Sequence, residues 1–421
     1  MKQKKISLKS EARRNYTIIF TNMSLFHLGF NLISPVTILP VYVSHLTGSN
    51  ILIGMVPAFV QVAFALPQLF GARYYERKKY AVPYMWRVNF TGRVIFGTYG
   101  LSAIFFAERF PELWLVLFFL ALGIFRGGVG FQSPGFTGVY GKVISPTIRG
   151  RVFGYTSAVG GALGAVGALI AAMILGESGF PEGFGVLLAF GGFFLAAVNS
   201  TMLLLKEPPS EVPSEPPGPI FTVFRRFPSV LQNDIRFRRY IIARTLLGWG
   251  TLSFGFFAVF GIGRYEATAA DVAIFTAILL ASQPILSLIW GQVADRTGPT
   301  IVPVFAGLLS VAAAMLAVVA PNIESFAIVF VLVGGAFGGY HLADFAAIYQ
   351  MAPSRQLLTY AAVFALMTQP AALVAAIAGG WLVDTVGFNA MFVIAAALSV
   401  AGVAAMALVP DATEQKDSAR I

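Results

Sequence analysis

The stretch IVPVFAGLLSVAAAMLAVVA, residues 301–320, has no charged side chain and a single hydroxyl group. An α-helix needs about 20 mainly apolar residues to cross the hydrocarbon core of a bilayer, so this stretch predicts a membrane-spanning helix. Eleven further stretches share its length and character: 17–43, 51–72, 82–106, 112–139, 153–175, 184–205, 240–261, 272–293, 325–349, 357–383 and 389–409. We therefore expect an all-α polytopic membrane protein with twelve transmembrane helices.

The composition supports this class. The 421 residues are 57% hydrophobic and 11% charged, whereas soluble globular proteins carry about 25% charged residues. The absence of cysteine excludes disulfides and thiolate metal sites, and the three histidines form no cluster with ligand spacing. We expect neither a metal nor any other cofactor.

The basic residues indicate the orientation. All but six of the 29 Lys and Arg residues lie at the N-terminus, at the C-terminus or in the even-numbered connections between spans. The exceptions are Arg87, Arg93, Arg109, Arg126, Arg244 and Arg264. Because positive loops stay in the cytoplasm, we expect both termini inside and a place in the bacterial cytoplasmic (inner) membrane. The same distribution accounts for the net charge of +10 and argues against a nucleic-acid partner.

A proline-rich segment divides the chain. Residues 206–219 read KEPPSEVPSEPPGP, which excludes a helix or strand and predicts an extended linker. We expect six-helix bundles at 1–205 and 240–421, joined by a cytoplasmic linker at 206–239. Residues 220–239 mix apolar side chains with five arginines, and two interpretations stay open. They form a short amphipathic helix on the membrane surface, interrupted at Pro228, or an ordinary basic tether.

The two parts repeat each other. The loop after the second span reads GARYYERKK from Gly71, and the loop after the eighth reads GQVADRTG from Gly291, which is 220 residues later. Pro146 and Arg149 are matched by Pro353 and Arg355 in the second part. Internal repeats of this kind are typical of secondary transporters.

The second loop resembles the loop signature of the major facilitator superfamily, on Gly291, Asp295, Arg296 and Gly298. The first loop keeps Gly71 and Arg77, but it has Tyr75 in place of the acidic residue and Glu76 one position later. The resemblance covers nearly the whole chain and implies two six-helix bundles. It also implies that these loops gate the change between inward- and outward-open states, and we expect the second loop to contribute more.

Two further motifs match the family only in part. Leu122, Arg126 and Gly130 follow its buried-arginine motif without the usual glutamine. The fifth span has several glycines but lacks the Gly-Pro pair of the antiporter signature, which disfavours a drug–proton antiporter. The pairs Gly160/Gly164, Gly334/Gly338 and Gly335/Gly339 predict close helix packing.

The resemblance implies that the first, fourth, seventh and tenth spans line a substrate cavity. A charge inside a span costs about 2.5–3.5 kcal/mol on insertion scales, so it usually faces a cavity or a partner. The polar residues of these four spans are therefore our candidate cavity residues: His27, Asn31, Arg126, Gln132, Arg244, His341 and Asp344.

Asp344 is the only carboxylate well inside a span, and His341 precedes it by three residues on the same helical face. We expect Asp344 to face Arg244, so that a proton on Asp344 or His341 breaks the pair and drives gating. The alternative is a permanent structural ion pair near the membrane surface.

Arg126 has no carboxylate deep inside any of the six spans of its half. An unpaired cation suits an anionic substrate group held by the guanidinium donors. The alternative is that backbone carbonyls or Gln132 satisfy it. We expect Arg87 to reach the membrane surface, and the sequence offers no account of Arg93.

These observations predict a secondary transporter, acting as a monomer, that moves a small solute by alternating access. Proton coupling and an organic-anion substrate are the favoured details, and an exporter or flippase of amphiphiles or lipids is the alternative. An intramembrane enzyme is disfavoured because neither a metal cluster nor a nucleophile elbow is present, and we assign no catalytic residue.

Overall fold

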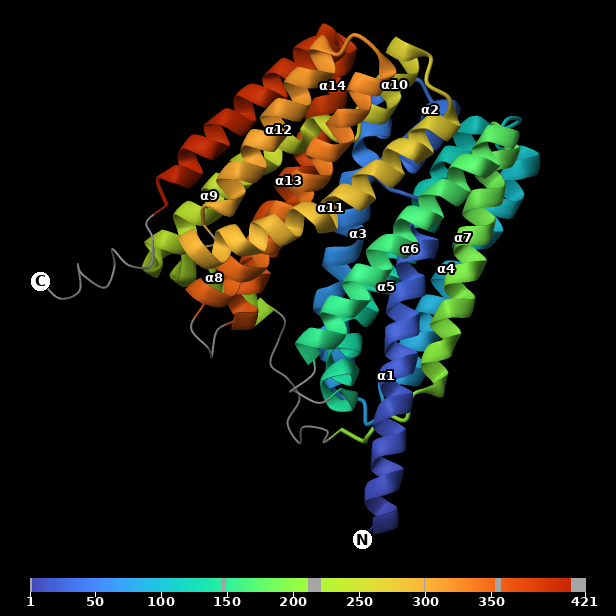
Figure 1. The fold of residues 1–421 in the computed structure, drawn as a ribbon, viewed down its shortest axis with the longest axis vertical. Helices are drawn as coiled ribbons and strands as arrows, with labels where there is room; N and C mark the ends of the chain where they lie inside the picture. The colour runs from blue at the N-terminus through green and yellow to red at the C-terminus, as the bar shows by residue number, and fades with distance from the viewer. Residues whose placement is uncertain (1, 145–148, 211–220, 299, 353–356, 410–421) are drawn as a thin grey trace, which may run out of the picture. The chain divides into compact units, whose positions relative to one another are not determined.

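The computed structural model describes residues 2–144, 149–210, 221–298, 300–352 and 357–409. Within these ranges every regular element is a helix, and no strand occurs (Figure 1). The α-helices are α1 (Lys2–Asn31), α2 (Ile38–Leu46), α3 (Asn50–Glu76), α4 (Val82–Phe106), α5 (Pro111–Val143), α6 (Arg149–Glu177), α7 (Glu182–Ser200), α8 (Phe221–Asn233), α9 (Ile235–Gly250), α10 (Phe257–Tyr265), α11 (Ala269–Thr297), α12 (Val302–Val319), α13 (Ile323–Met351) and α14 (Leu357–Ala407). Two 3-10 helices, η1 (Thr201–Leu204) and η2 (Thr251–Ser253), complete the set.

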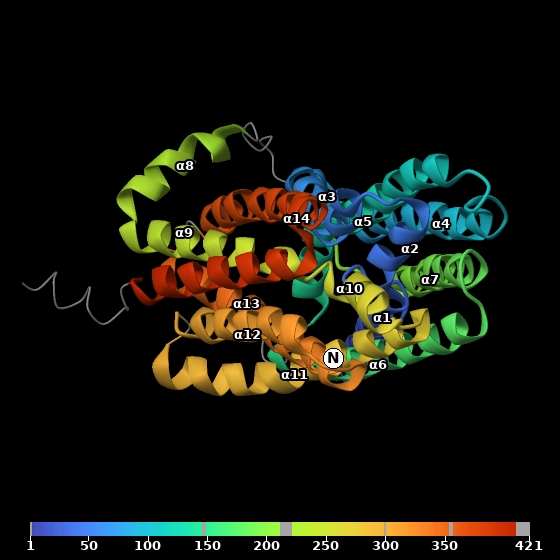
Figure 2. The same ribbon diagram turned by 90° about the horizontal axis from the view of Figure 1, so that it is seen from above.

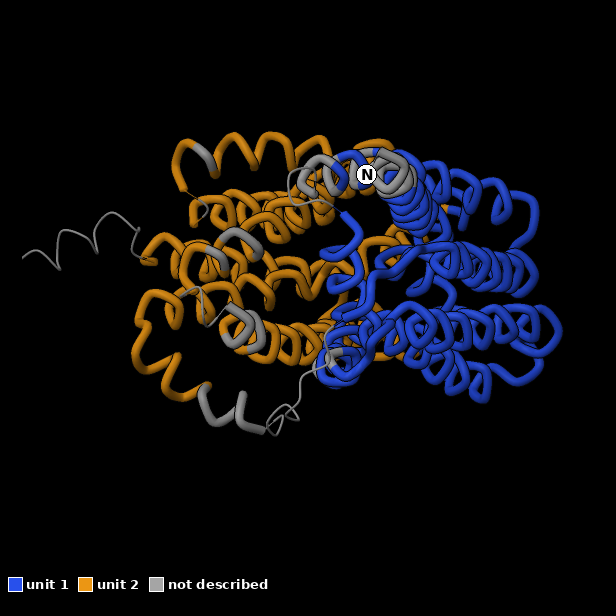
Figure 3. Tube along the Cα trace, turned by 90° about the horizontal axis from the view of Figure 1, so that it is seen from below, with its two compact units in different colours: residues 1–48, 59–218, 268–277 blue, residues 49–58, 219–267, 278–421 orange. Residues whose placement is uncertain are grey.

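The helices form two compact units, coloured separately in Figure 3. Unit 1 comprises residues 1–48, 59–218 and 268–277, and unit 2 comprises residues 49–58, 219–267 and 278–421. The first turns of α3 thus belong to unit 2, and the first turns of α11 belong to unit 1. The boundaries that we expect from the sequence, at 205 and 240, remain a proposal.

In unit 1, α4 packs against α5 and α7, and α1 packs against α6 and α7 (Figures 1 and 2). Glycine permits these close contacts, since a Cβ atom at Gly192 of α7 would collide with the backbone of Gly97 on α4. A Cβ atom at Gly164 of α6 would lie only 2.7 Å from Asn31 Nδ2 on α1. The predicted packing role of the Gly160/Gly164 pair is therefore confirmed.

In unit 2, α9 packs against α14, and α12 packs against α13 and α14. On α13, Gly338 faces α11, where a Cβ atom would lie 2.9 Å from Gln283 O. Gly339 faces α12, where a Cβ atom would lie 2.9 Å from Ala306 Cβ. Both predicted glycine pairs of this helix are confirmed as packing surfaces.

Two of the expected spans are not continuous helices, which corrects the sequence prediction. The span 17–43 consists of α1 and α2, and the span 240–261 consists of the end of α9, η2 and the start of α10. Pro35 accounts for the first break, because it lacks a backbone donor and disfavours helix at the preceding residue. Ile38 and Phe257, which restart the two helices, lie 219 residues apart, close to the 220 between Gly71 and Gly291. The break is thus part of the internal repeat.

The spans 357–383 and 389–409 lie on either side of a kink in α14. Gly387 has φ 83° and ψ 171° inside this helix, a backbone conformation that glycine adopts without steric cost. Two helices therefore meet at Gly387, as the sequence predicts.

Among the described residues, nine helices are long and apolar enough to cross a membrane, judged by length and composition. The ninth, Val363–Ala407, runs across the Gly387 kink, whereas α1, α2 and α4 are not among the nine. The structure therefore supports an all-helical, multi-spanning chain, and twelve spans remain a proposal.

The segment after the linker forms α8, which continues through Pro228. Our expectation that Pro228 interrupts the helix is wrong: a proline removes one backbone hydrogen bond, and the remaining turns hold. The turn to α9 occurs instead at Asp234, whose carboxylate accepts a hydrogen bond of 2.8 Å from the Phe237 amide and caps α9. Residues 211–219, most of the proline-rich linker, lie outside the described ranges, and neither interpretation of 220–239 as surface helix or tether is tested.

Candidate functional site

A charged pair joins α9 and α13 inside unit 2. Arg244 Nε donates a hydrogen bond of 2.8 Å to Asp344 Oδ1. The two side chains are 15% and 20% exposed, respectively. Tyr240, one helical turn before Arg244, donates a second hydrogen bond of 3.2 Å to the same oxygen. The predicted pairing of Arg244 with Asp344 is confirmed, and charge-assisted bonds of this length are strong ones.

Tyr340 completes this site from one turn before Asp344. Its ring centroid lies 4.3 Å from Arg244 Cζ, and its hydroxyl lies 3.1 Å from Ser310 Oγ on α12. The guanidinium is thus held by a carboxylate and an aromatic face. Sequence reasoning missed both tyrosines. Their spacing is a usable signal, since Tyr240 precedes Arg244 and Tyr340 precedes Asp344 by four residues each.

His341 makes no hydrogen bond to this pair among the described residues. Its side chain is exposed, and its ring stacks on Phe337 with centroids 6.5 Å apart. In the described part of the chain, no hydrogen bond joins His341 to Asp344. Its expected role as a proton acceptor remains a prediction.

Unit 1 holds buried arginines in a different setting. Arg126 on α5 is 7% exposed, and its Nε lies 3.5 Å from the Val60 carbonyl on α3, at the outer limit of a hydrogen bond. Its guanidinium carbon lies 4.9 Å from the Phe30 ring centroid and 5.3 Å from that of Phe64. No ion pair of Arg126 with a carboxylate occurs among the described residues.

Gln132 does not satisfy Arg126. Its Oε1 atom is buried and has no hydrogen-bond partner in the described ranges. Of the two alternatives to a substrate role, the structure therefore supports only the weak bond from Arg126 to a backbone carbonyl.

Arg93 on α4 is buried more deeply still, at 3% exposure. Its Nη1 donates a hydrogen bond of 2.7 Å to the Leu195 carbonyl of α7, and its Nε has no partner among the described residues. Its guanidinium carbon lies 5.6 Å from the centroid of the Phe26 ring. The sequence gives no account of this arginine because its partners are a backbone carbonyl and a ring, neither of which carries a complementary charge.

His27 and Asn31 on α1 lie against α6. A Cβ atom at Gly160 would touch the His27 ring, and Asn31 Nδ2 donates a hydrogen bond of 2.8 Å to the His27 carbonyl. Both residues take part in helix packing here, and their expected place in a substrate cavity remains a prediction.

The two gating loops are described in part. Gly71 packs against the Phe131 carbonyl of α5, and Arg77 and Arg296 are exposed. Gly291 on α11 borders open space. Gly298 ends α11 with φ +88° and donates a hydrogen bond of 2.9 Å to Ala294 O. The side chains of Glu76 and Asp295 lie outside what the structure describes.

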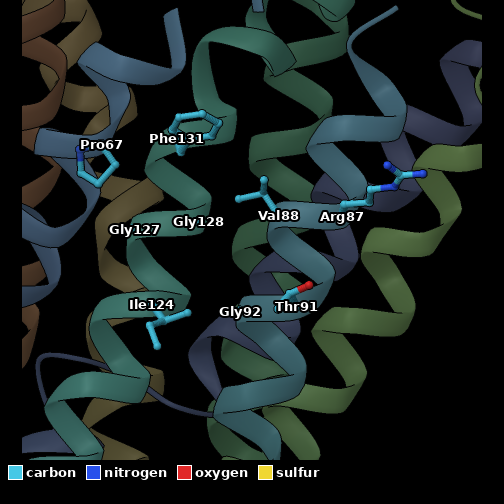
Figure 4. Close-up of a pocket in the computed structure, with 9 residues that line it drawn as sticks. All are labelled: Pro67, Arg87, Val88, Thr91, Gly92, Ile124, Gly127, Gly128 and Phe131. Carbon is cyan, nitrogen blue, oxygen red and sulfur yellow. The ribbon is translucent and has the colours of Figure 1, made fainter. Parts of the chain in front are cut away.

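An open groove of about 510 Å³ runs between α3, α4 and α5 of unit 1. Its lining is mainly apolar and is contributed by Pro67, Arg87, Val88, Thr91, Gly92, Ile124, Gly127, Gly128 and Phe131. The Arg87 side chain points away from Pro67 and Phe131 (Figure 4). It is exposed, which agrees with the expectation that it reaches the surface.

Comparison with known proteins finds a family model that matches part of the chain. Residues 262–420 match the family model of the Major Facilitator Superfamily. The match covers 159 of the 421 residues of the chain. No curated protein matches it.

Solved structures of superfamily transporters share the fold over almost the whole chain. A variant of the nucleoside transporter NupG is 15% identical, with a TM-score of 0.69 and coverage of 94% of this chain and 100% of that one. A POT family transporter in complex with 5-aminolevulinic acid is 12% identical, with a TM-score of 0.67 and coverage of 94% and 95%. A bacterial homologue of the human lysosomal transporter Spinster, inward-facing and unoccupied, is 15% identical, with a TM-score of 0.64 and coverage of 95% and 98%. The chain thus has the fold of these transporters.

Proposed function

We propose that this protein is a member of the Major Facilitator Superfamily and a secondary transporter that moves a small organic anion across the bacterial cytoplasmic membrane by alternating access. The observation that carries the proposal is Arg126, a buried cation whose partners among the described residues are a carbonyl at 3.5 Å and two phenylalanine rings. A buried charge without a counter-charge is costly. An anionic substrate would neutralise this charge while it is bound and then dissociate, which explains why unit 1 contains a buried cation.

The membrane topology is part of the proposal. The nine apolar helices give ten spans because α14 is divided at Gly387, and α1–α2 and α4 bring the number to twelve. The distribution of Lys and Arg supports cytoplasmic termini. The interruptions between α1 and α2 and between α9 and α10 support a transport role, because transporters use broken helices near their binding sites.

The pair of Arg244 and Asp344 supports proton coupling. Both side chains retain some exposure, so a proton can reach the carboxylate. Protonation would neutralise Asp344, remove its attraction for Arg244 and free α9 from α13. We expect Asp344→Asn to abolish the pH dependence of uptake in proteoliposomes while Glu11→Gln, at an exposed pair, keeps it. Unchanged pH dependence in Asp344→Asn would make the pair a permanent structural bridge.

A thermal-shift screen of the purified protein tests the substrate class. A ligand at about 100 times its dissociation constant stabilises the folded state by about 2.7 kcal/mol. We expect stabilisation by organic anions, lost in Arg126→Ala and retained in Arg109→Ala, the matched control with an exposed arginine in the same unit. Anion hits that survive Arg126→Ala would remove Arg126 from the binding site.

The open groove favours a second candidate, an exporter or flippase of amphiphiles or lipids. Its mainly apolar lining between α3, α4 and α5 suits an acyl chain. In the same screen, this function predicts stabilisation by amphiphiles alone and indifference to Arg126→Ala.

A further inference from the structure

Arg93 and Arg126 approach the same pair of aromatic rings. Phe26 and Phe30 stand one turn apart on α1 and stack with centroids 5.5 Å apart and an interplanar angle of 12°. Arg93 lies 5.6 Å from the Phe26 centroid, and Arg126 lies 4.9 Å from the Phe30 centroid. α4, α5 and α1 therefore bring two guanidinium groups to one place inside unit 1.

The two cations are close enough to interact electrostatically, and they repel each other. Side-chain exposure of 3% and 7% leaves little water to screen that repulsion. In the described part of unit 1 the ion pairs lie at its edge, between Lys142 and Glu207 and between Lys206 and Glu11. Neither reaches Arg93 or Arg126.

Both arginines also have N–H donors that make no hydrogen bond among the described residues. A guanidinium has five N–H donors. In the described ranges, Arg93 donates only through Nη1, and its buried Nε is unpartnered. Arg126 donates only through Nε, in a bond at the distance limit. A set of uncommitted donors around two positive charges is a recognition site for oxygen-rich anions.

We propose that Arg93 and Arg126 form one site that selects ligands carrying two negative charges, such as a phosphate monoester or a dicarboxylate. The inference rests on the proposed function and narrows its substrate class. A monoanion neutralises one guanidinium and leaves the other buried and charged, whereas a dianion neutralises both. Phe26 and Phe30 form the wall of the site on α1.

Matched ligand pairs test the charge preference on the purified full-length protein. Ethyl phosphate carries two negative charges at pH 7.5 and diethyl phosphate carries one, and succinate and succinamate differ in the same way. We expect the dianion of at least one pair to bind ten or more times more tightly by thermal shift. The pair that shows the preference identifies the site as one for phosphate or for dicarboxylate.

Single substitutions distinguish the roles of Arg93 and Arg126 in ligand binding. Arg93→Met is expected to reduce the dianion preference to less than threefold while monoanion binding persists, and Arg126→Met is expected to abolish binding of both. Arg109→Met, which removes an exposed arginine from the same unit, is expected to keep the full preference. A full preference in Arg93→Met would overturn the role of that residue.

A pH titration of the wild-type protein decides the question even if Arg93→Met fails to fold. The second pKa of a phosphate monoester is about 6, so the dianion fraction rises roughly tenfold between pH 5 and pH 7.5. Because the monoanion binds at least about tenfold more weakly, affinity for ethyl phosphate should rise by about five- to tenfold. Diethyl phosphate should bind equally at both pH values, and it reports any contribution from His27, the titratable neighbour of Phe26 on α1.

Failure of this inference is distinguishable from failure of the proposed function. Equal affinity for monoanions and dianions overturns the dianion site and leaves an organic-anion transporter in place. The dianion site is also overturned, and the transporter proposal stands, if none of the four probes binds while other organic anions stabilise the protein through Arg126. Stabilisation by amphiphiles alone overturns both.

Discussion

The buried arginines of unit 1 and unit 2 are neutralised in different ways. In unit 2, Arg244 has a carboxylate at 2.8 Å and a tyrosine ring beneath it. In unit 1, Arg93 and Arg126 have carbonyl groups and phenylalanine rings and no carboxylate among the described residues. The pair in unit 2 has no net charge, whereas the two arginines in unit 1 carry two positive charges. We infer that unit 2 holds a switchable internal pair and unit 1 holds a site for an external anion.

The internal repeat makes this difference informative. The two halves share the interrupted first helix at an offset of 219 residues, but they do not share the charges. At an offset of 220, Asp344 corresponds to Ile124, and Arg244 corresponds to Ser24. The backbone architecture is therefore common to both halves, and the polar residues give each half its own chemistry.

The largest expected effect on stability comes from breaking the complete pair. Asp344→Ala leaves Arg244 without its counter-charge, and breaking a buried pair costs about 3–5 kcal/mol. Because the pair is partly exposed, we expect a loss of about 2–3 kcal/mol, measured by denaturant unfolding in detergent. The double variant Arg244→Met with Asp344→Leu should recover most of it. A double variant as unstable as the sum of the single ones would contradict the account.

A smaller effect is expected from the carboxylate at the edge of unit 1. Glu207 accepts hydrogen bonds from the Ala81 and Val82 amides at the start of α4, and its Oε1 lies 2.9 Å from Lys142 Nζ. Its side chain is 4% exposed. Glu207→Gln keeps one acceptor oxygen for these amides but loses the other oxygen and the ion pair with Lys142, so it should destabilise the protein by about 1–2 kcal/mol. Glu11→Gln, at the exposed pair with Lys206, should cost less than about 0.5 kcal/mol. Equal losses would show that Glu207 does not hold the start of α4.

The hydroxyl of Tyr240 should have the smallest effect. Tyr240→Phe removes the 3.2 Å bond to Asp344 and keeps the ring, so we expect a loss of about 1 kcal/mol in unfolding free energy. Tyr16→Phe, at a tyrosine for which the structure shows only ring stacking, serves as the control. If Tyr240→Phe is as damaging as Asp344→Ala, the carboxylate is not the centre of this network.

Much of this architecture is predictable from the sequence because the bilayer imposes a length and a polarity on each span. The same cost of a charge in the membrane predicts the pairing of Arg244 with Asp344. Pro35 precedes α2 and is a sequence signal for the first break. No proline precedes α10, so the sequence predicts a continuous helix there. The position of Arg93 cannot be predicted from the sequence because its partners, the Leu195 carbonyl and the Phe26 ring, carry no complementary charge. Glu207 stands in a proline-rich segment, far in sequence from the α4 amides that it caps.

The most direct test of the central claim compares stability and transport in Arg126→Met. Removing a buried cation that has no carboxylate partner among the described residues should leave the ligand-free unfolding free energy unchanged or higher. Anion uptake into proteoliposomes, normalised to folded protein, should fall more than tenfold. A loss of about 2 kcal/mol or more with normal uptake by the remaining folded protein would contradict the claim, because Arg126 would then be a structural residue.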